Sequence, residues 1–217
     1  MQTMLKRFYK LVLTSLLGMS VACAEESGAF VGVEVGYAEL LLERASLESL
    51  TQNEKHNSIK YSVYFGYKQF FNPYLGLRYY ASFALAYKEK YKTGQYDEEY
   101  NILSLHYGGN VDFLSNFIAK ENVDFGSFVG IGIGGVSWNG KYIDEIYYKL
   151  KSAEKTSLDM WLNAGLRVNI AKQHGFEIGV RVPFIKTQIV NINIDNQRFK
   201  YTLSHTYNIG IRYIASF

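Results

Sequence analysis

The chain has 217 residues, a net charge of +3 and a mean hydropathy of −0.10, with 19 tyrosines, 14 phenylalanines and 19 glycines but only two prolines and one cysteine. This enrichment in aromatic residues and glycine favours strands over helices. The near-neutral hydropathy and the lack of an apolar run of 18 residues argue against a helical membrane protein, and a single cysteine excludes a disulfide scaffold. Any insertion into a membrane must therefore use strands.

Residues 1–24 have the pattern of a secretory signal peptide. Basic residues precede a short apolar stretch, and two small residues, Ala22 and Ala24, stand at the positions that signal peptidase reads. We expect cleavage after Ala24, which leaves residues 25–217 as the mature domain. A cut before Cys23, followed by lipidation of this residue, is the alternative, although the usual preceding leucine is missing.

The excess of positive charge belongs to this leader, which carries three basic residues and no acidic ones. Without it, acidic and basic residues are equal in number and no cysteine remains. The mature chain therefore offers no bulk charge for nucleic acid and no thiolate chemistry.

Alternation of apolar residues with a period of two predicts eight strands. Long polar connections follow strands one, three and five, and shorter ones follow strands two, four and six. An even number of antiparallel strands, with long loops on one side and short turns on the other, is typical of a transmembrane β-barrel of the bacterial outer membrane. The expected strands are residues 29–37, 59–68, 75–87, 103–113, 123–134, 160–170, 176–184 and 207–217, and the long loops are residues 39–58, 88–99 and 139–157.

The two faces of these strands differ. One face is almost wholly apolar, whereas the other combines glycines with bulky aromatic residues and few charges. In a soluble β-sandwich or a lipocalin-like barrel, the second face would be exposed to water. The mixture fits the crowded interior of an eight-stranded barrel, where small residues leave space for large ones. The bulky residues of this second face are Phe30, Tyr64, Tyr80, Phe128 and Trp161.

The charged residues of the second face are expected to be structural and paired inside the barrel, because buried charges are tolerated only with partners. A gated polar pathway is the alternative, but eight strands normally leave a filled lumen. We expect ion pairs among Arg167, Glu177, Arg181 and Arg212. The predicted lumen charges are Glu34, Lys60, Lys68, Arg78, Asp112, Arg167, Glu177, Arg181 and Arg212.

Pro183 is an irregular feature of the seventh strand, since proline cannot donate to a strand ladder. We expect either a bulge at this residue or the point at which the strand leaves the membrane.

The sequence gives no catalytic residues and argues against an enzyme. By alternation, His205 faces the lipid while Ser204 faces inward, and neighbours on opposite faces cannot share a hydrogen bond. His106 is expected to face inward, His56 to lie in a loop and His174 in a turn. A histidine within reach of both a serine and a carboxylate would reopen the question. No pattern for a metal or a cofactor is present, and the glycines of residues 130–135 lie within a strand, where packing explains them.

The end of the chain resembles known sequences. Ile209, Ile211, Tyr213 and Phe217 are similar to the C-terminal signature of outer-membrane proteins, which implies recognition by the barrel-assembly machinery. Residues 174–185, HGFEIGVRVPFI, resemble the penultimate strand of the Helicobacter outer-membrane protein family, the Hop/Hor/Hof-type proteins. The chain resembles a small member of this family, because it lacks room for the large adhesin domain and its cysteines.

The resemblance implies an integral protein of the bacterial outer membrane, in contact with lipid and lipopolysaccharide and without a cofactor. We expect a surface-exposed structural or host-interaction protein of the adhesion type, whose charged and tyrosine-rich loops contact a host ligand or lipid headgroups. The alternatives are a small porin or channel and, with less support, an enzyme that modifies lipids.

Overall fold

A computed structural model describes residues 27–46, 49–92, 99–141, 143–144, 148, 154–194 and 197–217. The predicted signal peptide, with its expected cleavage site at Ala22 and Ala24 and the alternative at Cys23, lies outside the described residues. Nine strands form one sheet. They are β1 (Ser27–Ser46), β2 (Ser49–Asn72), β3 (Leu75–Lys92), β4 (Glu99–Ala119), β5 (Val123–Asn139), β6 (Thr156–Ile170), β7 (His174–Pro183), β8 (Thr187–Ile194) and β9 (Gln197–Ser216).

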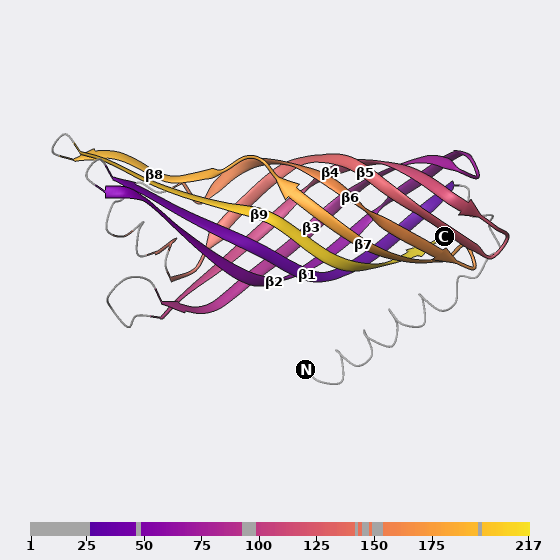
Figure 1. The fold of residues 1–217 in the computed structure, drawn as a ribbon, viewed down its shortest axis with the longest axis horizontal. Coiled ribbons are helices and arrows are strands. Elements are labelled where there is room, and N and C mark those ends of the chain that lie inside the picture. Colours follow the sequence, from indigo (N-terminus) through magenta and orange to yellow (C-terminus); the bar gives the residue numbers. More distant parts are fainter. Residues whose placement is uncertain are drawn as a thin grey trace, which may run out of the picture.

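The sheet closes into a barrel of eight strands. Each strand from β1 to β6 pairs antiparallel with the next, and β9 pairs with β1 on one edge. On its other edge β9 pairs with β7 near its end and with β8 near its start, so β7 and β8 are two halves of one barrel strand. The prediction of an eight-stranded antiparallel barrel is therefore confirmed (Figure 1).

The barrel is longer than the strands predicted from alternation. Figure 1 shows β8 and the adjoining ends of β1, β2 and β9 extended at one end, here called the extended end. The C-terminus lies at the opposite, short-turn end, where β2 turns into β3, β4 into β5, and β6 into β7. No helix in the described part of the chain is long and apolar enough to span a membrane.

The outer face of the barrel is apolar, as predicted. Side chains such as Val33, Ile131 and Ile211 point outward, and the exposed fraction of Ile211 is 65%. Their strand neighbours point inward and are buried, so the apolar groups lie outside and the polar groups inside. This arrangement is the reverse of a water-soluble barrel and is typical of a barrel that spans a membrane.

The first predicted loop was wrong. Residues 39–58 mostly continue β1 and β2, which pair from Leu40 and His56 out to Ser46 and Ser49. Beyond the apolar belt the outer face is not in contact with lipid, so polar residues can occupy it and the alternation that marks a strand disappears. The second predicted loop is also partly strand, because β3 extends to Lys92 and β4 begins at Glu99.

The third predicted loop is present, since residues 140–155 connect β5 to β6. Part of this connection is helical, and its Ile143 is fully buried.

Pro183 ends β7, which confirms the expectation of an interruption. The amide of Phe184 donates to the carbonyl of Met160 (3.0 Å), and regular pairing with β9 resumes only at Thr187. The proline therefore lies where the ladder is already broken and where its missing N–H costs least.

Candidate functional site

The interior of the barrel contains all nine of the predicted lumen charges. Glu34, Lys60, Lys68, Arg78, Asp112, Arg167, Glu177, Arg181 and Arg212 point inward and are buried. Inward direction follows from the period of two in each strand. The lumen therefore contains the buried charged side chains of this protein.

A network of ion pairs crosses the middle of the lumen. Arg78 donates through Nη2 to Asp112 (2.7 Å) on the neighbouring strand and through Nη1 to Glu177 (2.6 Å) on the far side. Glu177 also accepts from Arg212 (3.0 Å), whose Nη2 donates to Glu34 (2.9 Å). Each carboxylate thereby contacts a guanidinium, which compensates the cost of removing it from water.

Lys60 and Arg181 extend the network towards the extended end. Lys60 donates to Glu34 (3.1 Å), and Arg181 donates through Nε to Asn163 (3.1 Å). The guanidinium of Arg181 also lies over the ring of Trp161, 4.6 Å from its centroid. These contacts tie β2, β6 and β7 to the central pairs.

The expected pairing among four residues of the last strands is found only in part. Glu177 pairs with Arg212, but its second partner is Arg78 from the opposite wall. Arg167 stands beside Glu177 in register and donates to Asn116 (3.2 Å). Lys68, which is also buried, lies at the same short-turn side of the lumen.

Glycines make room for the aromatic rings of the lumen. Gly132 pairs with Trp161, and a Cβ on this glycine would lie 2.1 Å from the indole nitrogen. Gly165 pairs with Phe128 in the same way, with its Cβ position 2.6 Å from the ring. The rings lie flat against glycine backbone, so the lumen is filled by side chains, as the interior of an eight-stranded barrel is expected to be.

A separate apolar cluster lies in the lumen at the extended end. It contains buried side chains from four barrel strands, from β8 and from the connection after β5. The indole of Trp138 donates to Thr187 (2.9 Å), which fixes the largest ring of the cluster. Its members are Leu40, Leu42, Ile102, Val136, Trp138, Ile143, Ile189, Val190 and Leu203. We call this group the apolar plug.

Two histidines lie between the apolar plug and the ion pairs. The Nε2 of His205 is 2.9 Å from the hydroxyl of Ser104, and its ring stacks on Trp138 with centroids 5.1 Å apart. His106 faces inward, as expected, with its Nδ1 3.5 Å from Asp159 and its ring 4.9 Å from that of His205. The prediction that His205 faces the lipid was therefore wrong.

A bulge in β9 explains this error. Glu39 of β1 pairs with Tyr207, but Leu40 pairs with His205, so Thr206 is an extra residue. One extra residue reverses the face that each following side chain takes. The only hint in the sequence was Pro183, which interrupts the neighbouring strand at this height. Ser104 and Asp159 carry no signal that would have placed them beside the histidines.

This group does not form a catalytic triad. His205 reaches the serine, whereas the carboxylate lies beside His106, so neither histidine contacts both partners. All four side chains are buried beneath the apolar plug. Within the described residues, no group of three or more His, Cys, Asp or Glu side chains has an arrangement that could hold a metal ion.

The remaining histidines lie elsewhere. His56 belongs to β2 rather than to the predicted loop, and its Nε2 is 3.6 Å from Glu54. His174 begins β7, beside its turn, with its Nδ1 2.7 Å from the hydroxyl of Tyr213.

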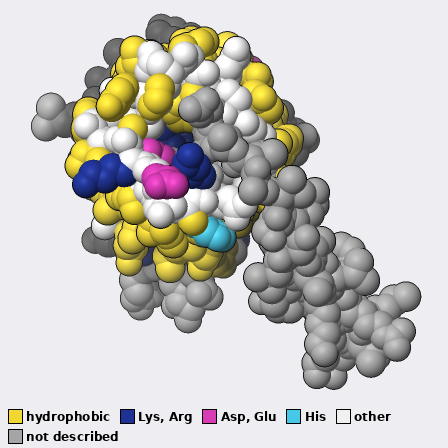
Figure 2. Space-filling view, turned by 90° about the vertical axis from the view of Figure 1, so that its right-hand side faces the viewer, with side chains coloured by type: hydrophobic (Ala, Val, Ile, Leu, Met, Phe, Trp, Pro, Cys, Tyr) yellow, Lys and Arg dark blue, Asp and Glu magenta, His cyan; other side chains and the backbone are white. Residues whose placement is uncertain are grey.

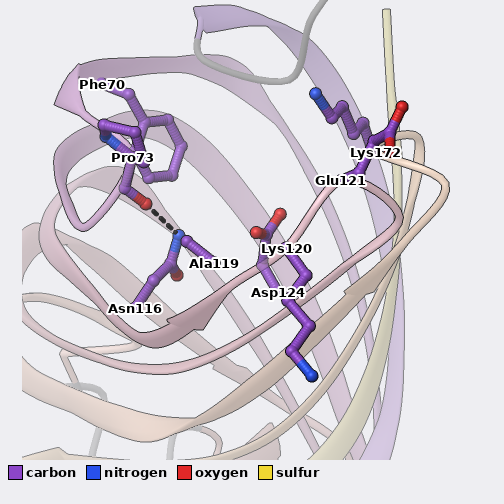
Figure 3. Close-up of a pocket in the computed structure, with 8 residues that line it drawn as sticks. All are labelled: Phe70, Pro73, Asn116, Ala119, Lys120, Glu121, Asp124 and Lys172. Atoms are coloured by element: carbon purple, nitrogen blue, oxygen red, sulfur yellow. Dashed lines mark hydrogen bonds between the residues drawn. The ribbon is translucent and has the colours of Figure 1, made fainter.

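Charged side chains reach the surface at the short-turn end. Figure 2 shows both signs of charge at the centre of this end, with hydrophobic side chains around them. A cavity of about 210 Å³ lies between the turns (Figure 3), where the amide of Asn116 donates to the carbonyl of Pro73 (2.9 Å). Lysines and carboxylates line it together, so the cavity favours neither anions nor cations. Its lining is Phe70, Pro73, Asn116, Ala119, Lys120, Glu121, Asp124 and Lys172.

The residues of the C-terminal signature lie on the outer face of β9. Ile209 and Ile211 are exposed, Tyr213 is half-buried, and Phe217 ends the chain with its amide bonded to the carbonyl of Ala29 (2.9 Å). The signature is therefore a continuous apolar stripe on the strand that closes the barrel.

The family model of the Helicobacter outer membrane protein matches residues 62–217, which is well over half of the chain. The chain belongs to this family. The resemblance seen in the sequence is thereby confirmed, and so is the location in the outer membrane of a Gram-negative bacterium. For this outer membrane protein, the short-turn end faces the periplasm and the extended end faces the cell exterior, because such barrels have short periplasmic turns and long extracellular loops. A comparison with curated proteins gives no match.

Solved structures of other outer-membrane barrels resemble this outer membrane protein in outline. OprG from Pseudomonas aeruginosa has 14% identity and a TM-score of 0.49, with 87% of this chain and 96% of that chain covered. Neisserial surface protein A has 11% identity and a TM-score of 0.43, with 88% and 99% covered. Ail, the attachment invasion locus protein of Yersinia pestis, has 12% identity and a TM-score of 0.34, with 85% and 99% covered. At these values, none of the three bears on the function of this chain.

Proposed function

We propose that this protein is a closed outer-membrane barrel that presents its extended extracellular end as a contact surface for a host ligand. The filled lumen carries this proposal. Ion pairs occupy the middle, glycine-seated aromatic rings lie among them, and the apolar plug covers the outer opening. Side chains fill the described part of the lumen and the apolar plug lies above them, so we assign the function to the outer surface.

The extended end supports a role in contacts. β1 and β2 continue for many residues beyond the apolar belt, and their outward faces carry polar groups such as the Lys55–Glu39 ion pair (3.0 Å). Lys186 forms a similar pair with Glu43 (2.8 Å) across this rim. A rigid sheet that projects from the membrane holds its surface groups in place, which lowers the entropy lost on binding.

We also propose that the protein is not an enzyme. The serine and histidine that lie close together are buried, and the carboxylate that a hydrolase would need contacts the other histidine. The partners that we propose are lipid and lipopolysaccharide around the belt, the barrel-assembly machinery during insertion, and the host ligand at the rim.

Adherence of intact bacteria tests the contact role. Residues 44–52 close the β1–β2 hairpin, and Glu43 pairs with Asn53, so these residues can be replaced by an Asn-Gly turn with the remaining register intact. We expect the shortened barrel to insert normally and the cells to adhere less to epithelial monolayers. The matched control is Lys172→Gly at the periplasmic end, which should leave adherence unchanged. Equal adherence of cells with the shortened and the natural barrel would contradict the proposal.

A further inference from the structure

The lipid-facing belt has a hollow where two small residues stand side by side. Ala81 of β3 pairs with Gly109 of β4, and both point outward. Larger side chains surround them, and the space between has a volume of about 620 Å³. The space is a shallow depression that is open on its outer side, so it can hold a chain that lies along the surface. Phe65 and Tyr79 bound the hollow on one side, and Ile131 and Ile133 bound it on the other.

Two aromatic rings, those of Phe65 and Tyr79, line one side of the hollow, and each stacks on a ring outside it. The rings of Phe65 and Phe83 stack with centroids 6.0 Å apart, and those of Tyr67 and Tyr79 stack at 5.8 Å. Rings held by such pairs have few alternative positions. The side chains of Phe65 and Tyr79 therefore stay at the edge of the hollow and do not cover Gly109.

The floor of the hollow stays open. A Cβ placed on Gly109 would meet no atom within 4 Å. Gly135, another outward-facing glycine on the neighbouring strand, is different, because the ring of Tyr107 covers it and would lie 2.7 Å from an added Cβ. The side chain of Tyr107 therefore covers Gly135 and leaves Gly109 bare. The hollow is consequently a feature of the fold and needs no movement to form.

The hollow lies near the middle of the apolar belt and has no charged residue in its lining. Along β4, Leu105 and Tyr107 lie on one side of Gly109, and Val111 and Phe113 lie on the other. In the outer membrane this belt is already in contact with the acyl chains of lipids, and the hollow is continuous with that surface. Ends of acyl chains reach this depth.

A second copy of the barrel fits the hollow less well. A twofold axis through the hollow would place one hollow opposite the other, so the rims would touch and enclose a void. Side chains that face a void make no dispersion contacts with the partner, and such contacts drive association inside a membrane. A flexible acyl chain can instead follow the floor and contact both walls. We propose that the hollow binds the end of an acyl chain of a membrane lipid.

Photolabelling tests this site with the full-length protein. The purified barrel is reconstituted in phospholipid vesicles that contain a phospholipid with a diazirine at the end of one acyl chain, and labelled residues are mapped by mass spectrometry after irradiation. We expect several-fold more label on Val111 and Ile131 than on Ile178 and Ile211, which stand at the middle of the belt on β7 and β9. This comparison is made within the wild-type molecule and needs no variant.

Two variants sharpen the result. Gly109→Leu fills the hollow and should lower its label to the level of the rest of the belt, because the new side chain occupies the floor. Ala164→Leu adds the same bulk at an outward position on β6 and should leave the preference intact. Each variant is first shown to fold by its heat-modifiable mobility on a gel. Equal labelling around the wild-type belt, unchanged label in Gly109→Leu, or a photocrosslinked dimer joined through this face would overturn the proposal.

Discussion

Arg78 holds together the two sides of the central ion network, so its removal should be among the most costly single changes in the lumen. Its side chain is almost fully buried, bonds to Asp112 and Glu177, and lies 4.9 Å from the ring centroid of Phe128. Arg78→Met keeps much of the volume but leaves Asp112 without this partner. Breaking a buried pair by removing one member costs about 3–5 kcal/mol.

The free energy of unfolding can be measured by urea titration of the barrel in vesicles, with tryptophan fluorescence and heat-modifiable mobility as two readouts. We expect Arg78→Met to lower it by about 3–5 kcal/mol. The double variant Arg78→Met/Asp112→Asn should recover about half of this loss, because the second change removes the uncompensated charge. Lys55→Met, which breaks an exposed pair at the rim, should cost under about 1 kcal/mol.

Two outcomes would refute this reasoning. A loss for Arg78→Met as small as that for Lys55→Met would show that the central pairs do not stabilise the barrel. A double variant no more stable than the single one would show that the cost lies in lost packing around the guanidinium and not in the stranded carboxylate.

Three further predictions concern packing, the turn and assembly. Gly132→Ala should lower the free energy of unfolding by about 1–3 kcal/mol and shift the fluorescence emission of Trp161, because the new Cβ collides with the indole. Gly109→Ala should change neither quantity. Equal effects of the two variants would contradict the packing of lumen rings against glycine. Lys172→Gly should raise the free energy of unfolding by about 1 kcal/mol, because Lys172 has a φ of 61° in its turn, and a urea titration that shows a decrease would contradict that strain. Deletion of Phe217 should lower the amount of folded barrel in outer-membrane fractions while export continues, and unchanged insertion would show that the terminal residue is not an assembly signal.

The sequence predicts the part of this barrel that lies in the membrane better than the part outside it. Lipid on one side and a packed lumen on the other impose a period of two, so the direction of Val33, Glu34 and Arg212 follows from alternation alone. Above the belt, Leu40 and Leu42 point inward into the apolar plug while polar residues occupy the outer face. The apolar outer stripe that marks a membrane strand is therefore missing there. The lengths of β1 and β2 were therefore underestimated.

Partners within the lumen could not be predicted for a different reason. Alternation gives the face of each side chain but not the residue that it meets across the lumen, such as Glu177 for Arg78. A single inserted residue, Thr206, also changes the face of His205 without a mark of its own in the composition of β9. Alternation and loop lengths predicted the architecture, and the family resemblance supported the location, whereas these contacts depend on how the strands are arranged in space.

The central claim, that the barrel is closed along its length, is tested most directly by conductance. Folded protein, verified by its heat-modifiable mobility, is inserted into planar bilayers at neutral pH beside a general porin as a positive control. The filled lumen and the apolar plug predict no stable current steps from this protein under conditions in which the porin conducts. Stable ohmic steps that increase in number with the amount of folded protein would contradict the account.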